Sequence, residues 1–246
     1  MSGTAPDDPA ITEPVFPPLF EGYAMSGQAD PFDAACAKAA LGCDAGLVMH
    51  NVQADRLRAA IVFAPEVPLG EAMVMQPLCG IGFQNALGAL APPELAVQLT
   101  WEGGIVVNGA ACGHLSVAAS TDDPAQVPDW LVVGLSLPLL AMGDMPGHEP
   151  EKTTLVEEGC GEVEPVLLLE AWVRHSLVWL NRWSDEGVAP LHREWSGLVH
   201  GIGASASRGG HEGVFLGTDE AFGMLLRDSA TTHLIPLTTL LEDPTR

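Results

Sequence analysis

Basic side chains are the scarcest feature of this 246-residue sequence. Ten lysines and arginines stand against 32 aspartates and glutamates, which gives a formal net charge of −22. Only two of the ten are lysines, Lys38 and Lys152. Because so acidic a chain repels phosphate backbones, we expect no nucleic-acid partner.

Long apolar runs are also missing. A membrane-spanning helix needs roughly 18 to 20 consecutive apolar residues, and the nearest candidate, residues 131–142, is shorter. The opening MSGTAPDDPAITEP carries acids instead of a basic segment followed by an apolar one, so no secretory signal is visible. We therefore expect a cytoplasmic protein with no membrane partner.

The cysteines and histidines follow no recognisable pairing or metal-binding pattern. Five cysteines form an odd set without CxxC spacing, which favours reduced thiols over disulfides or a zinc ribbon. The eight histidines include no HExxH pair. The acidic stretch 141–164 lacks the spacing of a calcium loop, so we expect no metal site.

The most informative stretch is 96–119, AVQLTWEGGIVVNGAACGHLSVAA. Apolar and β-branched residues dominate it, Gly103 and Gly104 interrupt the run, and Asn108-Gly109 is a strong hairpin signal. This pattern predicts three antiparallel strands folded on one another.

Around these strands the periodicity predicts an α+β protein. Helices are expected at 31–41, 69–90, 166–185 and 190–200, and strands at 45–50, 57–63, 130–138, 204–208, 214–218, 223–227 and 233–240. Helices packed on a mixed or antiparallel sheet are the usual α+β arrangement. We expect an extended or disordered segment at 1–30, a main domain at 31–200 and a small β-domain at 201–246.

The order of Trp101, a polar glycine turn, Asn108-Gly109 and Gly113-His114-Leu115 resembles the core of the biotin/lipoate protein ligase family. The run from Gly213 to Leu226 is similar to the GxxxGIDxxGxLL pattern of the small C-terminal domain of these ligases. The resemblance covers nearly the whole chain. It implies a class II ligase-like catalytic domain that moves a biotinyl, lipoyl or octanoyl group onto a lysine of a carrier-protein domain. Because few residues precede the first predicted helix, we expect no DNA-binding domain of the kind that some biotin ligases carry.

The chain departs from the family at the positions that carry the chemistry. The family's lysine, which offsets negative charge on the acyl-adenylate, falls on Thr100, and its proline falls on Glu102. Its two acidic-amide positions fall on Gly103 and Gly104.

The nucleotide-binding segments of the family are altered as well. The glycine- and arginine-rich loop is replaced by residues 50–56, which contain no glycine. At the end of the later strand the family's Gly-x-Gly-x-Asn becomes Gly134, Ser136 and Pro138, and proline offers no N–H. We therefore expect ATP not to bind.

The resemblance implies a ligand cleft whose residue types are mostly small or polar. The expected ligand-binding residues are Trp101, Glu102, Gly103, Gly104, Gly113, His114, Gly134, Ser136, His50 and Arg56. The catalytic candidates are Thr100 and Cys112, the latter as the nucleophile of an octanoyltransferase variant. A second interpretation is that the small residues only let strands and helices pack closely.

Three functions remain open. The first is a non-catalytic homologue that keeps the cleft and binds biotin, lipoate or octanoate. The second is an active ligase or acyltransferase, and the third is an interaction scaffold. A homo-oligomer fits any of them.

Overall fold

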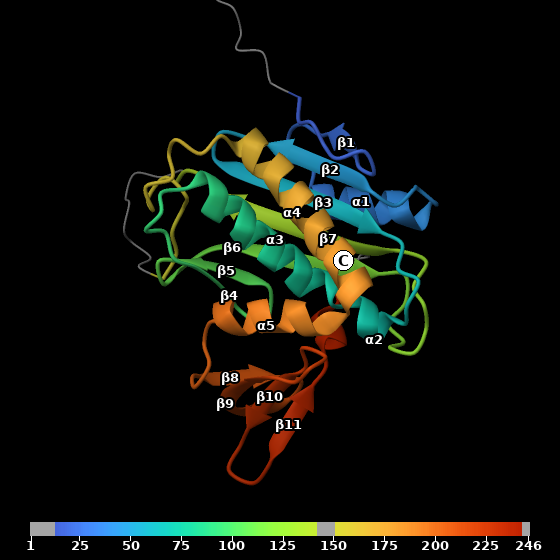
Figure 1. Ribbon diagram of the computed structural model, residues 1–246, viewed down its shortest axis with the longest axis vertical. Helices are drawn as coiled ribbons and strands as arrows, with labels where there is room; N and C mark the ends of the chain where they lie inside the picture. Colours follow the sequence, from blue (N-terminus) through green and yellow to red (C-terminus); the bar gives the residue numbers. More distant parts are fainter. Residues whose placement is uncertain (1–12, 142–150, 243–246) are drawn as a thin grey trace, which may run out of the picture.

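The computed structural model describes residues 13–141 and 151–242. Within these ranges the chain forms a large sheet with helices on both faces and a small second sheet built from the C-terminal residues (Figure 1). None of the helices in the described ranges is long and apolar enough to cross a membrane. The α+β class expected from the periodicity is confirmed.

The large sheet has seven strands in the order β1-β2-β3-β7-β6-β5-β4. Its strands are β1 (Glu21–Ala24), β2 (Leu47–Val52), β3 (Arg56–Phe63), β4 (Val97–Leu99), β5 (Gly104–Val107), β6 (Ala110–Ala119) and β7 (Leu131–Pro138). All neighbours are antiparallel except β1 and β2. The predicted hairpins of 96–119 are present as β4, β5 and β6. Asn108 and Gly109 turn between the last two with positive φ angles of 49° and 92°.

Strand β1 is absent from the strands expected from the sequence. Its four residues, EGYA, are all exposed. They do not alternate between apolar and polar types, so the sequence carries no periodic signal of a strand. They form a strand because the chain before α1 runs parallel to β2, with Glu21 paired to Leu47. A tertiary contact with no local pattern produces this strand.

Helices α3 (Met75–Leu90) and α4 (Pro165–Glu186) cover one face of the sheet, and α1 (Pro31–Ala40) covers part of the other. The larger apolar core lies between the sheet and the α3–α4 pair. Helices α3 and α4 approach so closely that a Cβ on Gly82 would lie 2.6 Å from Ser176 Oγ. A smaller cluster beneath α1 includes Cys36, Ala60 and Val132.

The prediction of a single helix at 69–90 is wrong in one respect. The segment divides into α2 (Leu69–Ala72) and α3. Pro77 lies in the first turn of α3. Its ring has no N–H and would clash with the carbonyl four residues earlier in a continuous helix. The break at Met73 and Val74 places the proline where a helix tolerates it.

The small sheet consists of β8 (Ser205–Arg208), β9 (His211–Thr218), β10 (Met224–Arg227) and β11 (Thr232–Ile235), in the order β11-β10-β9-β8. It lies below α5 (Val188–Leu198) in Figure 1. The strand expected at 233–240 stops at Ile235, because Pro236 follows and cannot donate a ladder hydrogen bond. The chain continues instead as a 3₁₀ helix, Leu237–Leu240.

The chain then returns to the large sheet. After the 3₁₀ helix, the backbone N–H of Glu242 donates to the carbonyl of Val117 in β6 at 2.9 Å. The last described residues therefore lie beside the strand that carries His114.

Candidate functional site

Thr100 closes the turn between β4 and β5. Its Oγ1 accepts a hydrogen bond from the backbone N–H of Gly104 at 2.9 Å, and its own N–H donates to the Gly104 carbonyl at 2.8 Å. The hydroxyl therefore caps a tight turn. No positive charge occupies the place that the resemblance gives to a lysine.

Trp101 is buried and links the two sheets. Its side chain is 2% exposed, and the indole Nε1 donates to the backbone carbonyl of Phe222 at 2.7 Å. Phe222, whose φ is 63°, also meets His192 and Trp195 edge-on, with ring centroids 5.2 Å and 6.0 Å away. The indole lies in the core and fixes the small sheet against it.

The glycines expected to line a cleft occupy places where backbone or side chains pass close by. A Cβ on Gly103, whose φ is 95°, would collide with the Leu115 carbonyl. A Cβ on Gly113 would lie 2.9 Å from the Ser136 carbonyl, and one on Gly134 would lie 2.6 Å from the ring of Phe32 in α1. Close packing accounts for the absence of a side chain at each of the three positions.

One row of residues crosses the sheet on the face that α1 partly covers. Asn51 pairs with Arg58, Arg58 with Ser136, Ser136 with His114, and His114 with Gly104. Directly paired residues on neighbouring strands share a face of the sheet. The structure thus brings together Ser136 and His114, two of the predicted ligand-binding residues, and adds Arg58, which was not among them.

Arg58, a member of this row, forms an ion pair with the residue that caps α1. Its guanidinium lies 3.5 Å from Asp30, the N-cap residue of α1, and its side chain is 13% exposed. Its Nε is buried and has no hydrogen-bond partner in the described part of the protein. The Asn51 amide donates to the carbonyls of Gly27 and Ala29, which ties the turn before α1 to β2.

His114 lies between charges of both signs. Desolvation lowers its pKa, Glu242 and Glu102 act in the opposite direction, and Arg208 lowers it further. Arg208 and Glu102 form an ion pair at 3.4 Å. His114 therefore favours the neutral imidazole, which can both donate and accept a hydrogen bond.

His50 and Arg56 are not brought to this row. His50 pairs with Ala59 and lies one residue from Asn51, so it faces the opposite side of the sheet. There it is 6% exposed, meets Phe16, and has a pKa lowered by burial. Arg56 lies two residues before Arg58 on the same face, pairs with Pro138 and is exposed at the start of β3.

Cys112 is buried in the core. Its side chain has no exposed surface, and desolvation, followed by the nearby Glu158, raises the pKa of its thiol to about 12. A thiol in this state forms almost no thiolate at neutral pH, and the thiolate is the nucleophile. The position does not favour covalent catalysis.

We expect iodoacetamide at about pH 8 to leave Cys112 unmodified in the folded protein, while the less buried Cys43 reacts first. Above about pH 9 the unfolded chain would release the Cys112 proton and the folded chain would keep it. This thiol should therefore lower the free energy of unfolding by about 1.4 kcal/mol per pH unit. Peptide mass mapping and alkaline unfolding of the parent and Cys112→Ala check both points. Rapid native labelling of Cys112 would contradict its burial.

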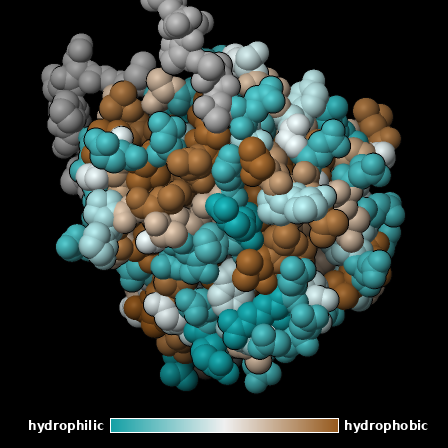
Figure 2. Space-filling view, turned by 45° about the horizontal axis from the view of Figure 1, so that its top comes forward, coloured by the Kyte–Doolittle hydropathy of each residue, from teal (hydrophilic) through white to brown (hydrophobic). Residues whose placement is uncertain are grey.

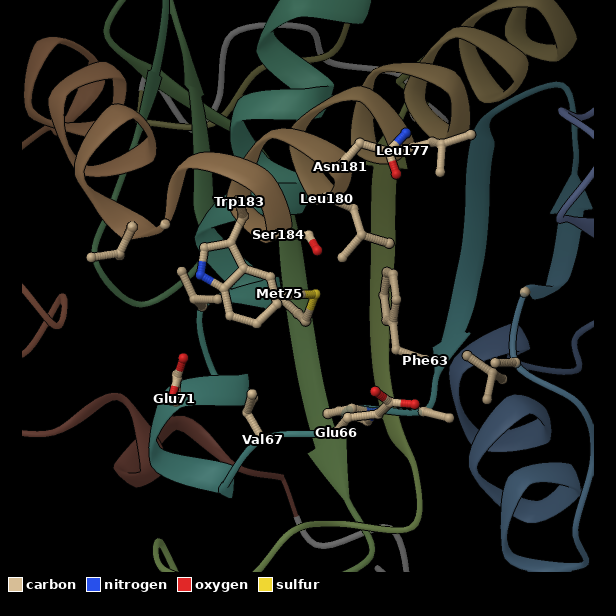
Figure 3. A pocket seen from close by; sticks show the side chains of 18 of the residues that line it. Phe63, Glu66, Val67, Glu71, Met75, Leu177, Leu180, Asn181, Trp183 and Ser184 are labelled. Atoms are coloured by element: carbon tan, nitrogen blue, oxygen red, sulfur yellow. The ribbon is translucent and has the colours of Figure 1, made fainter.

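A large hollow of about 1120 Å³ lies on the other side of the sheet (Figure 3). It is bounded by α4, the end of β3, α2 and the loop at Glu220 of the small sheet. None of the residues expected from the resemblance lines it. Its lining comes from segments distant in sequence, so no motif could have revealed it.

No three or more histidine, cysteine, aspartate or glutamate side chains within residues 13–141 and 151–242 are grouped so that they could hold a metal ion.

Comparisons with known proteins agree with this fold. The model of the biotin/lipoate A/B protein ligase family matches residues 16–197. A second model, described as a domain of unknown function (DUF4444), matches residues 202–243. No curated protein matches the sequence.

Among solved structures, a biotin protein ligase-like protein of unknown function from Silicibacter sp. TM1040 is 58% identical. The match covers 94% of this chain and 100% of that one, with a TM-score of 0.88. The biotin protein ligase from Aquifex aeolicus in complex with biotin and ATP is 14% identical over 88% and 94% of the two chains, with a TM-score of 0.64. The biotin protein ligase from Leishmania major in complex with biotin is also 14% identical, over 89% and 98%, with a TM-score of 0.55. The two distant ligases show the shared fold. The family model covers residues 16–197, which is most of the chain, so this protein belongs to the biotin/lipoate A/B protein ligase family.

Proposed function

We propose that this protein is a non-catalytic member of its family that binds a neutral acyl group, such as an amide or ester, without activating it. The observation that carries the proposal is the state of Arg58. Its charge is balanced by Asp30, while its buried Nε–H has no partner. A buried donor without an acceptor costs free energy, and the carbonyl oxygen of a neutral acyl group would satisfy it if the ligand displaced the atoms that cover Nε.

The charges of this sheet face argue against an acyl-adenylate. Two arginines near the row are already paired with carboxylates, Arg58 with Asp30 and Arg208 with Glu102. Arg56, on the same face of β3, is exposed at the edge of the site. A phosphate would have to compete with those carboxylates and would meet Glu242 as well. The short connection between β2 and β3 offers no glycine N–H groups to wrap a phosphate.

Neutral hydrogen-bonding groups complete the proposed site. Ser136 pairs with Arg58 on one side and with His114 on the other, and the pKa of His114 is lowered. A hydroxyl and a neutral imidazole can bind a carbonyl or an amide N–H. The acyltransferase alternative finds no support, because the thiol of Cys112 is buried and its pKa is about 12.

We expect lipoamide and octanamide to raise the melting temperature of the protein more than lipoate and octanoate do. A ligand that binds only the folded state adds stability according to its affinity. Arg58→Lys is the matched variant, because lysine keeps a cation beside Asp30 and removes the Nε–H. It should weaken lipoamide binding about threefold to tenfold, the worth of one hydrogen bond. Equal shifts with acids and amides, or no change in Arg58→Lys, would refute the proposed ligand class.

A further inference from the structure

The large hollow between α4, β3 and the small sheet lies apart from the row of Arg58, Ser136 and His114. Its floor is apolar: Phe63 and Met75 are 7% and 2% exposed, and Leu180 and Trp183 of α4 are half-buried. Figure 3 shows Leu180 and Trp183 extending from α4 into the hollow, with Met75 and Phe63 beyond them. Its volume of about 1120 Å³ is ample for a small molecule, since ligand pockets measure roughly 300–1,000 Å³.

Apolar side chains also reach solvent elsewhere. Figure 2 shows brown areas among hydrophilic residues on the face that it draws, and Leu167 and Val178 of α4 are about half-exposed. What distinguishes the hollow is that three separate parts of the chain enclose it, namely the large sheet, α4 and the Glu220 loop. Junctions of this kind are frequent positions of small-molecule sites.

The charged residues of the hollow are all acidic. Glu66, Glu71 and Glu220 line it, and its described lining contains no lysine, arginine or histidine. The neighbouring basic residue of α4, Arg182, is engaged elsewhere, with its Nε 3.2 Å from Glu186 and its guanidinium over the ring of Trp179. The hollow therefore presents carboxylates from the β3–α2 connection, from α2 and from the small domain.

We propose that this hollow is a binding site for a small organic amine with an apolar body and a protonated amino group. The apolar body would cover Phe63, Met75 and Leu180. The ammonium group would meet the glutamates and the face of Trp183, which attracts cations. The net charge of −22 would also raise the local concentration of a cationic ligand.

Three probes with the same eight-carbon chain test the charge preference. We expect octylamine to bind in isothermal titration about tenfold more tightly than octanol, and octanoate more weakly than either. Equal affinity for all three compounds would show that the hollow takes up apolar chains without selecting an amine, and would overturn the proposal.

Two sets of variants locate the binding. A triple variant that combines Glu66→Gln, Glu71→Gln and Glu220→Gln should weaken octylamine binding about tenfold. The control, Glu94→Gln with Glu162→Gln and Glu194→Gln, removes the same number of exposed charges outside the hollow and should have little effect. If both triple variants lose affinity equally, octylamine is attracted by net charge alone and the site assignment is wrong.

A steric variant tests occupancy of the hollow directly. Ser184 is exposed, and Figure 3 shows it among the side chains that line the hollow. Ser184→Trp should fill the space and abolish octylamine binding, whereas Asp185→Trp, at the next position and outside the lining, should not. Thermal unfolding confirms that both variants fold, and unchanged octylamine affinity in Ser184→Trp would overturn the proposal. The lipoamide response, which depends on Arg58, should survive in Ser184→Trp.

Discussion

Replacing Trp101 with alanine is expected to lower the free energy of unfolding by about 3–5 kcal/mol. The indole is 2% exposed in the main core, so its removal leaves a large cavity. The substitution also removes the hydrogen bond to the Phe222 carbonyl. Because Phe222 has an unfavourable φ of 63° for a bulky residue, the loop that carries it should loosen when this bond is lost.

Trp101→Phe separates the two contributions. Phenylalanine keeps most of the apolar ring but loses the donor and a small part of the volume, so we expect a cost of about 1–2 kcal/mol. Chemical denaturation gives both values, and hydrogen exchange at residues 219–223 reports on the loop. A measured cost below about 1 kcal/mol for Trp101→Ala would mean that the indole is not a core residue. Trp101 would then have to be assigned to an open ligand cleft.

Gly103→Asn, which introduces a residue type that the family carries at its acidic-amide positions, is expected to cost about 3 kcal/mol or more. The φ of Gly103 is 95°, and a Cβ there would collide with the Leu115 carbonyl and come within 2.6 Å of Gln76 Nε2. The carbonyl belongs to the backbone of β6 and cannot move aside.

Gly109→Asn is the matched control. Gly109 has a similar φ of 92°, but nothing lies within 4 Å of the position that its Cβ would occupy. It should lose only about 1 kcal/mol, the cost of the backbone conformation. Urea unfolding of both variants measures the difference, which isolates the collision. Equal losses would mean that β6 does not pass closely behind Gly103.

Much of the fold follows from local patterns. The Asn108-Gly109 turn, the apolar spacing of α4 and the glycine-separated strands of the C-terminal region all predict their elements, because each element buries one face and each turn needs particular residues. The exceptions have physical causes. β1 forms only by pairing with β2, and Pro77 divides the helix that begins at Leu69.

The site could be predicted only in part. Ser136 and His114 do share a face, because strand pairing follows from the hairpin order. Trp101 lies elsewhere than expected, since a tryptophan in a motif carries no sign of whether its indole points toward a cleft or toward Phe222. Arg58 was missed because an arginine at a strand start is usually exposed, and Asp30, its ion-pair partner, is distant in sequence.

We propose that this ligase fold does not activate an acyl group with ATP. Isothermal titration of the protein with ATP and magnesium, in the presence and absence of lipoate, tests it most directly. We expect no binding heat for the parent or for Thr100→Lys, because a lysine in the β4–β5 turn would not create a loop that wraps the phosphates. Micromolar affinity for ATP in the parent protein would show that the fold still binds the nucleotide and would refute the proposal.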